Sequence, residues 1–142
     1  MPRRPRLLVA GIPLHITQRG VNRGATFVDA DDHRRYRDLL AETALAHDIR
    51  VHAYVLMTNH VHLLATPDRT DDLAYAMRRL NQCYVSAFNR RHGRTGTLWE
   101  SRFHSCLVDS ERYALTVHRY IELNPVRAAM VEEPARYPWS SA

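Results

Sequence analysis

Lysine is absent from this chain of 142 residues, so arginine supplies all 20 of its permanently positive side chains. They outnumber the 15 acidic residues, which gives a formal net charge of +5 and a pI of about 9.7. Arginine presents a planar fork of donors that suits phosphate, and a basic chain favours an anionic partner, above all nucleic acid. A GC-rich genome that encodes arginine in place of lysine explains the same composition, so both interpretations stay open.

Cysteine is scarce, and long apolar runs are missing. Cys83 and Cys106 form neither a CxxC pair nor a disulfide framework, which is typical of a reducing, cytoplasmic setting. The apolar run at 7–12 is too short for a signal peptide, and no stretch reaches the ~20 apolar residues of a membrane span. We therefore expect one domain over residues 1–142, with residues 1–6 as a basic, disordered arm.

The spacing of apolar residues predicts an α+β fold. Strands are expected at 14–19, 50–57, 60–66 and 98–108, and helices at 31–47, 70–92 and 111–123, with a short helix from Pro125. The expected helix caps are Asp31 or Asp32, Thr70, Gly93, and Asp109 or Ser110. The first six elements match the ferredoxin-like βαββαβ pattern, an antiparallel sheet with helices on one face. The other face, or one end, is left for a ligand or for the C-terminal helix.

The stretch MTNHVHLL, residues 57–64, places His60 and His62 on either side of Val61. Side chains on a strand repeat every two residues, so both imidazoles are expected on the same face of the sheet. Two neutral imidazoles this close can share a divalent ion. Alternate histidines on a strand are nevertheless more often ordinary, partly exposed residues. The pair alone leaves both interpretations open.

The last long helix offers two further polar groups. Tyr120 and Asn124 lie one turn apart in HRYIELNPVR, so they share a helix face. Tyr120 can also be a core aromatic residue, and Asn124 can simply cap the short helix that follows. If this helix lies over the histidine face, two imidazoles and an amide oxygen make a three-ligand site for Mg²⁺ or Mn²⁺. Tyr120 can then attack a phosphate held at that site.

Three blocks of the sequence carry a family resemblance. VHAYVLMTNHVHLL, RRHGRTGTLWESRF and HRYIELNPVRAAMV together resemble the IS200-like transposases of the HUH single-strand nuclease superfamily. The similarity is greatest to the REP-associated tyrosine transposases, and it runs from GIPLHITQRG to YPWSS. One departure is Thr58, where many relatives have proline in the turn before the histidines.

The resemblance implies a metal-dependent enzyme that cuts single-stranded DNA through a 5′-phosphotyrosine intermediate and leaves a free 3′-hydroxyl. The HUH pair falls on His60 and His62, the nucleophile on Tyr120, and the third ligand on Asn124. The implied metal is Mg²⁺ or Mn²⁺, and the implied substrate is single-stranded DNA with a REP-like hairpin. We expect a monomer or homodimer in the cytoplasm, at the nucleoid, with the tyrosine helix packed on its own chain.

Binding of single-stranded DNA needs a basic groove and surfaces for base stacking. The candidates are Arg19, Arg23, Arg94, Trp99, Arg102, His104, Arg119 and Arg127. Each arginine can instead be a solvated surface residue, and Trp99 can be a core residue. Two other functions remain: a non-catalytic nucleic-acid-binding module of the same fold, and a metallohydrolase that uses metal-bound water. A binding module does not explain why the histidine pair and the tyrosine helix occur together. A metallohydrolase would need an acidic ligand or a general base, and the sequence offers none near the site.

Overall fold

A computed structural model describes residues 9–142, so the basic arm expected at 1–6 lies outside the described residues. The strands are β1 (Leu14–Arg19), β2 (Ile49–Leu56), β3 (His60–Pro67) and β4 (His104–Leu107). The α-helices are α1 (Ala30–Ala46), α2 (Asp72–His92), α3 (Glu111–Glu122) and α4 (Asn124–Arg127). Short 3₁₀ turns lie at Val21–Arg23 and Pro134–Arg136. The predicted α+β order is confirmed.

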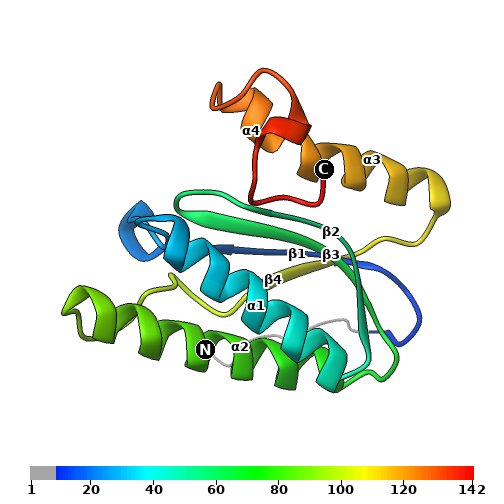
Figure 1. Cartoon of the computed structure of the whole chain (residues 1–142). Coiled ribbons are helices and arrows are strands. Elements are labelled where there is room, and N and C mark those ends of the chain that lie inside the picture. The colour runs from blue at the N-terminus through cyan, green and yellow to red at the C-terminus, as the bar shows by residue number, and fades with distance from the viewer. Residues whose placement is uncertain (1–8) are drawn as a thin grey trace.

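The four strands form one sheet in the order β2-β3-β1-β4, and every neighbouring pair is antiparallel. This is the strand order that the βαββαβ pattern produces when each crossover skips one strand. Helices α1 and α2 lie together on one face of the sheet, and α3 and α4 lie on the other (Figure 1). The sheet thus separates a two-helix layer from the helix that carries Tyr120.

Two of the four predicted helix ends follow the predicted signals. Ser110 caps α3 by accepting from the Tyr113 amide, and Gly93 ends α2 with a φ of 63°. The predicted cap of the first helix is wrong, because Asp29, which precedes Asp31 and Asp32, caps α1. The predicted cap at Thr70 is also wrong: α2 begins after Asp71, which makes no side-chain cap hydrogen bond.

The fourth strand is much shorter than predicted. Only His104–Leu107 pairs with β1, although the sequence predicted a strand from 98 to 108. The segment before it is irregular: Trp99 forms an isolated bridge with Gly20, just after β1, and the Glu100 amide donates to the Arg19 carbonyl. Its apolar residues Trp99 and Phe103 are buried, so they mimic a strand in the sequence while they fill the core from a loop.

Two hydrophobic clusters lie on either side of the sheet. The larger one joins α1 and α2 to the sheet through residues such as Tyr36, Leu80 and Tyr84. The smaller one joins α3 to β2 and β3, and Val117 and Ile121 are its contributions from α3. Burial of these two side chains fixes α3 over the β2–β3 half of the sheet.

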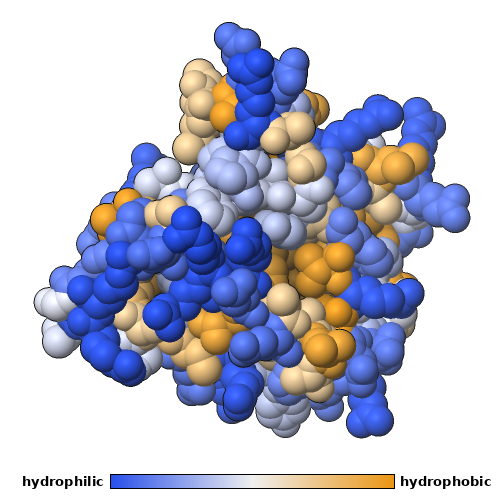
Figure 2. Space-filling model, in the orientation of Figure 1, coloured by the Kyte–Doolittle hydropathy of each residue, from blue (hydrophilic) through white to orange (hydrophobic). Residues whose placement is uncertain are grey.

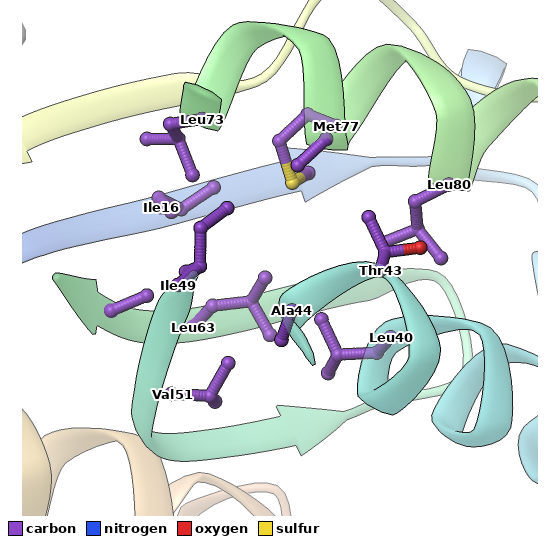
Figure 3. Close-up of a pocket in the computed structure, with 12 residues that line it drawn as sticks. Ile16, Leu40, Thr43, Ala44, Ile49, Val51, Leu63, Leu73, Met77 and Leu80 are labelled. Carbon is purple, nitrogen blue, oxygen red and sulfur yellow. The ribbon is translucent and has the colours of Figure 1, made fainter. Parts of the chain in front are cut away.

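The larger cluster contains a small void between α1, α2 and the sheet (Figure 3). Its volume is about 20 Å³, room for about one water molecule. Apart from the Thr43 hydroxyl, its labelled lining is apolar, with Ile16, Leu63 and Met77 facing one another across it. A water molecule there lacks the hydrogen-bond partners it needs, so the void is a packing gap rather than a ligand site.

The outer side of this layer is mostly polar. Figure 2 shows hydrophilic groups over most of the visible face, with hydrophobic groups in smaller, separate areas. Both cysteines, Cys83 and Cys106, are free, as the sequence predicted. Within residues 9–142, no helix is both long and apolar enough to cross a membrane.

The C-terminal segment adds to the edge of the sheet, which the sequence did not predict. The Leu56 amide donates to Trp139, the Ser141 amide donates to Tyr54, and Val55 forms a bridge with Ser140. The Ser141 hydroxyl also donates to Glu122 at the end of α3. These contacts connect the last residues of the chain to both β2 and α3.

Candidate active site

The register of β1 and β3 creates a polar strip on the face that α3 covers. Thr17 lies opposite His62, and Arg19 lies opposite His60. The alternate residues of both strands point into the larger core, where Ile16 and Val61 are fully buried. The predicted placement of both imidazoles on one face is therefore what the structure has.

The two histidine rings lie 5.2 Å apart, centroid to centroid, and nearly perpendicular at 87°. His60 uses its Nδ1 for a 2.8 Å hydrogen bond with Asn59 Oδ1. His62 uses its Nδ1 for a 3.1 Å hydrogen bond with His15 Nε2 of β1. Three imidazoles therefore meet on the face of two neighbouring strands.

Helix α3 brings Tyr120 to these imidazoles. Because Ile121 is fully buried against the sheet, the preceding residue lies at the margin of the packed stripe. The Tyr120 ring is 5.7 Å from the His62 ring and 6.0 Å from the His15 ring, both edge-on. It also remains 46% exposed, so a ligand can approach it from solvent.

Asn124 opens α4, and its amide interacts with the His60 ring. Pro125 follows it in the first turn, so the predicted short helix is present at the predicted place. Asn124 lies one turn after Tyr120, and the two side chains therefore meet the two histidines from the same side. The structure thus brings together His60, His62, Tyr120 and Asn124.

Arg127 is held against the tyrosine. Its guanidinium carbon lies 4.2 Å from the centre of the Tyr120 ring, and one of its N–H groups donates to the Tyr120 carbonyl at 2.7 Å. A cation over an aromatic face is attracted by the ring quadrupole. Arg127 therefore restrains the ring and places a positive charge beside it.

Burial keeps the imidazoles neutral. It lowers the pKa of His62 to about 3, with smaller contributions from the charges of His60, His15, Arg127 and Arg19. Burial also lowers the pKa of His15 and of His60, and at His60 the interaction with Asn124 partly opposes the shift. Neutral imidazole is the form that binds a metal ion.

The side chains fit a divalent ion with mixed nitrogen and oxygen ligands. His60 and His62 supply two neutral nitrogens, and Asn124 supplies an amide oxygen beside them. Across residues 9–142, no group of three or more His, Cys, Asp and Glu side chains converges on a metal position. Two imidazoles and one amide are thus the groups that could coordinate a metal ion among the residues brought together here.

An open cleft of about 220 Å³ runs along the histidine face. Its walls include Arg19, Glu100 and His104 in addition to the two histidines. A second hollow of about 380 Å³ shares Arg19 and Glu100 with it and extends to Arg23. The two hollows thus share Arg19 and Glu100, and together they are lined by three of the predicted DNA-binding residues, Arg19, Arg23 and His104.

The remaining DNA-binding candidates differ in their surroundings. Arg102 and Arg119 are exposed to solvent. Arg94 hydrogen-bonds Asn89 and the Thr97 carbonyl, so its guanidinium closes the loop after α2. Trp99 is only 5% exposed and belongs to the larger core, so the expectation that it offers a stacking surface is wrong. A buried indole has no free face for a base.

Three residues at this site were missed in the sequence. His15 follows the same alternation as Thr17 and Arg19, but its contact with His62 depends on the β1–β3 register. Asn59 was assigned only to a turn, and Glu100 to a strand that the structure lacks. The one available signal was the alternating pattern LHITQR, which places His15 on the same face as Arg19.

Comparison with known proteins agrees with this arrangement. Residues 9–124 match the family described as transposase IS200 like. The solved structure of a REP-associated tyrosine transposase bound to a REP hairpin is similar, with a TM-score of 0.81. The two sequences are 20% identical, and the match covers 99% of this chain and 82% of that chain.

A crystal structure assigned to a transposase from Deinococcus radiodurans R1 has a TM-score of 0.51 and 23% identity. That match covers 85% of this chain and 96% of the other. At these identities the two structures establish the fold, and no protein with a curated description matches the sequence significantly. The family match spans most of the chain, so the protein belongs to the IS200-like transposases and is a tyrosine transposase of the HUH single-strand nuclease type.

Proposed function

We propose that the chain is a metal-dependent endonuclease and strand transferase for single-stranded DNA, with Tyr120 as its nucleophile. The observation that carries the proposal is the position of the Tyr120 ring, 5.7 Å from the His62 ring and within the same chain. An exposed phenol beside two neutral imidazoles that line an open cleft suits attack on a phosphate bound there.

His60, His62 and Asn124 are the residues that would hold Mg²⁺ or Mn²⁺. When bound, the ion supplies a Lewis acid that polarises the scissile phosphate and offsets charge in the transition state. The protein contributes the neutral state of the histidines, since burial lowers the pKa of both. Arg127, and Arg19 beside His60, add positive charge around the phosphate position.

In the cleavage step, the Tyr120 oxygen forms a bond to phosphorus as the bond to the 3′-oxygen breaks. The phenolic proton is lost, and the departing oxygen gains a proton to become a free 3′-hydroxyl. The 5′-phosphate stays on the tyrosine, so the energy of the broken bond is retained. A 3′-hydroxyl from another strand can later attack this phosphotyrosine, which reseals the DNA and releases Tyr120.

We infer that the substrate is single-stranded DNA that carries a REP-like hairpin. The structural relative was solved with a REP hairpin, and this chain has a basic path from the histidines past Arg19 to Arg23. Its net charge of +5 favours a polyanion. The arrangement of Tyr120 on its own chain suits a monomer as well as a homodimer, acting in the cytoplasm at the nucleoid.

The test is incubation of the protein with single-stranded DNA that carries a palindromic hairpin, in the presence of Mg²⁺ or Mn²⁺. We expect a protein–DNA adduct that survives denaturation, is lost on chelation, and is lost in Tyr120→Phe while binding persists. Tyr113→Phe is the matched control, because Tyr113 is another exposed tyrosine of α3.

Three outcomes contradict the proposal. An adduct of equal yield in Tyr120→Phe removes Tyr120 from the role of nucleophile. Cleavage without an adduct indicates attack by water instead, for which Glu100 in the same cleft is the available carboxylate. Binding that is insensitive to chelator, with no cleavage under any metal, indicates a non-catalytic binding module.

A further inference from the structure

Each histidine of the pair makes a hydrogen bond through the same ring nitrogen. His60 contacts Asn59 Oδ1 through Nδ1, and His62 contacts His15 Nε2 through Nδ1. The partners come from different places: Asn59 is the adjacent residue, and His15 lies on the neighbouring strand β1. Nδ1 is thus engaged in both rings, and Nε2 is the nitrogen left for a metal ligand bond or, at His60, for the Asn124 amide.

The direction of the hydrogen bond at His60 follows from the orientation of the Asn59 amide. Asn59 Nδ2 donates to the Arg23 carbonyl at 3.1 Å, so the amide oxygen is the atom that faces His60. An amide oxygen can only accept. The proton must therefore lie on His60 Nδ1, which leaves a lone pair on Nε2.

The bond at His62 joins two imidazoles, and either ring can donate. The rings are stacked at 5.3 Å with an angle of 26°, and their facing nitrogens are 3.1 Å apart. If His15 donates, His62 must carry its own proton on Nε2, and that nitrogen is blocked. If His62 donates, its Nε2 is free, and the two histidines of the pair have the same protonated nitrogen.

We propose that Asn59 and His15 are positioning residues that accept hydrogen bonds from His60 and His62 and thereby fix both rings as Nδ1–H tautomers. The claim that Nε2 then meets a metal ion rests on the proposed function, whereas the tautomers are a property of the metal-free protein.

The need for such partners is chemical. A free imidazole in water prefers its proton on Nε2, the nitrogen that this site must keep bare. A partner that accepts from Nδ1 sets the tautomer, fixes the ring plane and raises the basicity of the other nitrogen. The Asn59 amide also connects His60 to the loop at Arg23, which has a positive φ of 57°. The conformation of that loop therefore helps to hold the ring.

The first experiment determines the tautomer of each histidine in the metal-free protein by long-range proton–nitrogen NMR at neutral pH. We expect both His60 and His62 to be Nδ1–H in the native sequence. His15→Leu should shift His62 towards the Nε2–H form and leave His60 unchanged. Asn59→Ala should shift His60 towards the Nε2–H form and leave His62 unchanged. His15→Gln and Asn59→Asp each keep an accepting oxygen near the original position and should restore the native tautomer.

The second readout is Mn²⁺ affinity, measured by titration without DNA. Loss of a residue that hydrogen-bonds a metal-binding histidine typically weakens metal binding by about 10- to 100-fold. We expect this effect for His15→Leu and for Asn59→Ala. His52→Leu is the matched control, because His52 also makes a cross-strand hydrogen bond, to Thr66 at 2.7 Å, but lies outside the site. It should leave Mn²⁺ affinity unchanged.

The inference is overturned if His62 is Nε2–H in the native protein, or if His15→Leu changes neither the tautomer nor the affinity. If the native protein has the expected tautomers but does not bind Mn²⁺, the positioning role is supported and the proposed metal site is contradicted. If Tyr120→Phe loses the adduct but the native protein has other tautomers than those expected, the proposed function is supported and this inference is rejected. The two claims therefore fail separately.

Discussion

Two clusters with buried histidines lie on opposite faces of the sheet, and they are built in opposite ways. Between α1 and α2, which we call the paired cluster, Asp29 and Asp32 bind Arg91 at 2.6 and 2.8 Å, and Asp32 also meets His92 at 2.8 Å. Under α3, which we call the imidazole cluster, His60 and His62 make hydrogen bonds through Nδ1 with neutral side chains, those of Asn59 and His15.

The difference lies in the carboxylates. In the paired cluster, hydrogen bonds from Arg91 hold the pKa of Asp29 far below its ordinary value, so opposite charges offset one another. In the imidazole cluster no carboxylate of residues 9–142 forms an ion pair with the rings, and burial drives the rings to stay neutral. The first arrangement joins two helices, and the second keeps lone pairs available for a ligand. We therefore expect stability to depend on one cluster and chemistry on the other.

The largest expected effect is on chemistry. Replacement of both His60 and His62 by alanine removes two proposed ligands, and cleavage should fall by at least about 100-fold. The free energy of unfolding should change little, because the rings are only partly buried and have no ionic partner. Adduct yield and urea unfolding measure the two quantities. Unchanged cleavage in the double variant contradicts the assignment of this cluster to catalysis.

The next effect is on stability. Asp32 is 1% exposed and accepts from Arg91, His92 and the Val28 amide, so Asp32→Asn removes a buried negative charge that three donors share. The free energy of unfolding should fall by about 2–3 kcal/mol, measured by urea denaturation.

Asp31→Asn is the control for that experiment, because the Asp31 side chain is 66% exposed. Its effect should stay below about 1 kcal/mol. Mn²⁺ binding should survive in both variants. A loss of metal binding in Asp32→Asn with the fold intact would mean that the two clusters are coupled through the sheet.

The clusters should also respond to pH in different windows. His62 is neutral in the folded protein, with a pKa lowered to about 3, but takes up a proton near 6.5 when unfolded. Its contribution to stability is therefore complete above pH 6.5 and is lost as pH falls towards 3. Asp29 has a lowered pKa too, but its ordinary value is 3.8, so its contribution is lost only below that pH.

Urea unfolding over a series of pH values tests this separation. His62→Gln should flatten the decline between about pH 6.5 and pH 4, and Asp29→Asn should flatten only the decline at lower pH. A decline above pH 4 that is unchanged in His62→Gln would show that His62 is not buried in its neutral form.

The smallest effect concerns Arg127. Loss of its contact with the Tyr120 ring removes about 1 kcal/mol of restraint, so Arg127→Ala should slow adduct formation by up to about tenfold. Arg112→Ala is the matched control on α3, since Arg112 is exposed and lies far along the helix from Tyr120. Single-turnover cleavage kinetics distinguish the two. Equal rates for both variants would limit Arg127 to a structural contact.

Much of the fold could be predicted from local signals. The alternation in LHITQR gave β1 correctly, and Ser110 and Gly93 marked helix ends because their chemistry suits those positions. The fourth strand failed because burial and strand pairing are different properties. Trp99 and Phe103 fill the core from a loop, which apolar periodicity cannot distinguish from a strand.

The site was predictable only in part, for a related reason. His60 and His62 share a strand, and Asn124, at the start of α4, follows Tyr120 of α3 by one turn, so each pair follows from local spacing. The face on which α3 lies depends on the packing of Val117 and Ile121, and here the family resemblance supplied what spacing could not. The His15 contact depends on strand register, which no local pattern specifies.

The pairing of residues 139–141 with β2 has a consequence for the protein in solution. An open sheet edge exposes unpaired amides and carbonyls that can recruit a second chain and seed aggregation. Here the chain's own end occupies part of the β2 edge, and the opposite edge is β4, a strand of only 4 residues. Both edges of the sheet are thus poor templates for further strands, which disfavours edge-to-edge association of folded molecules.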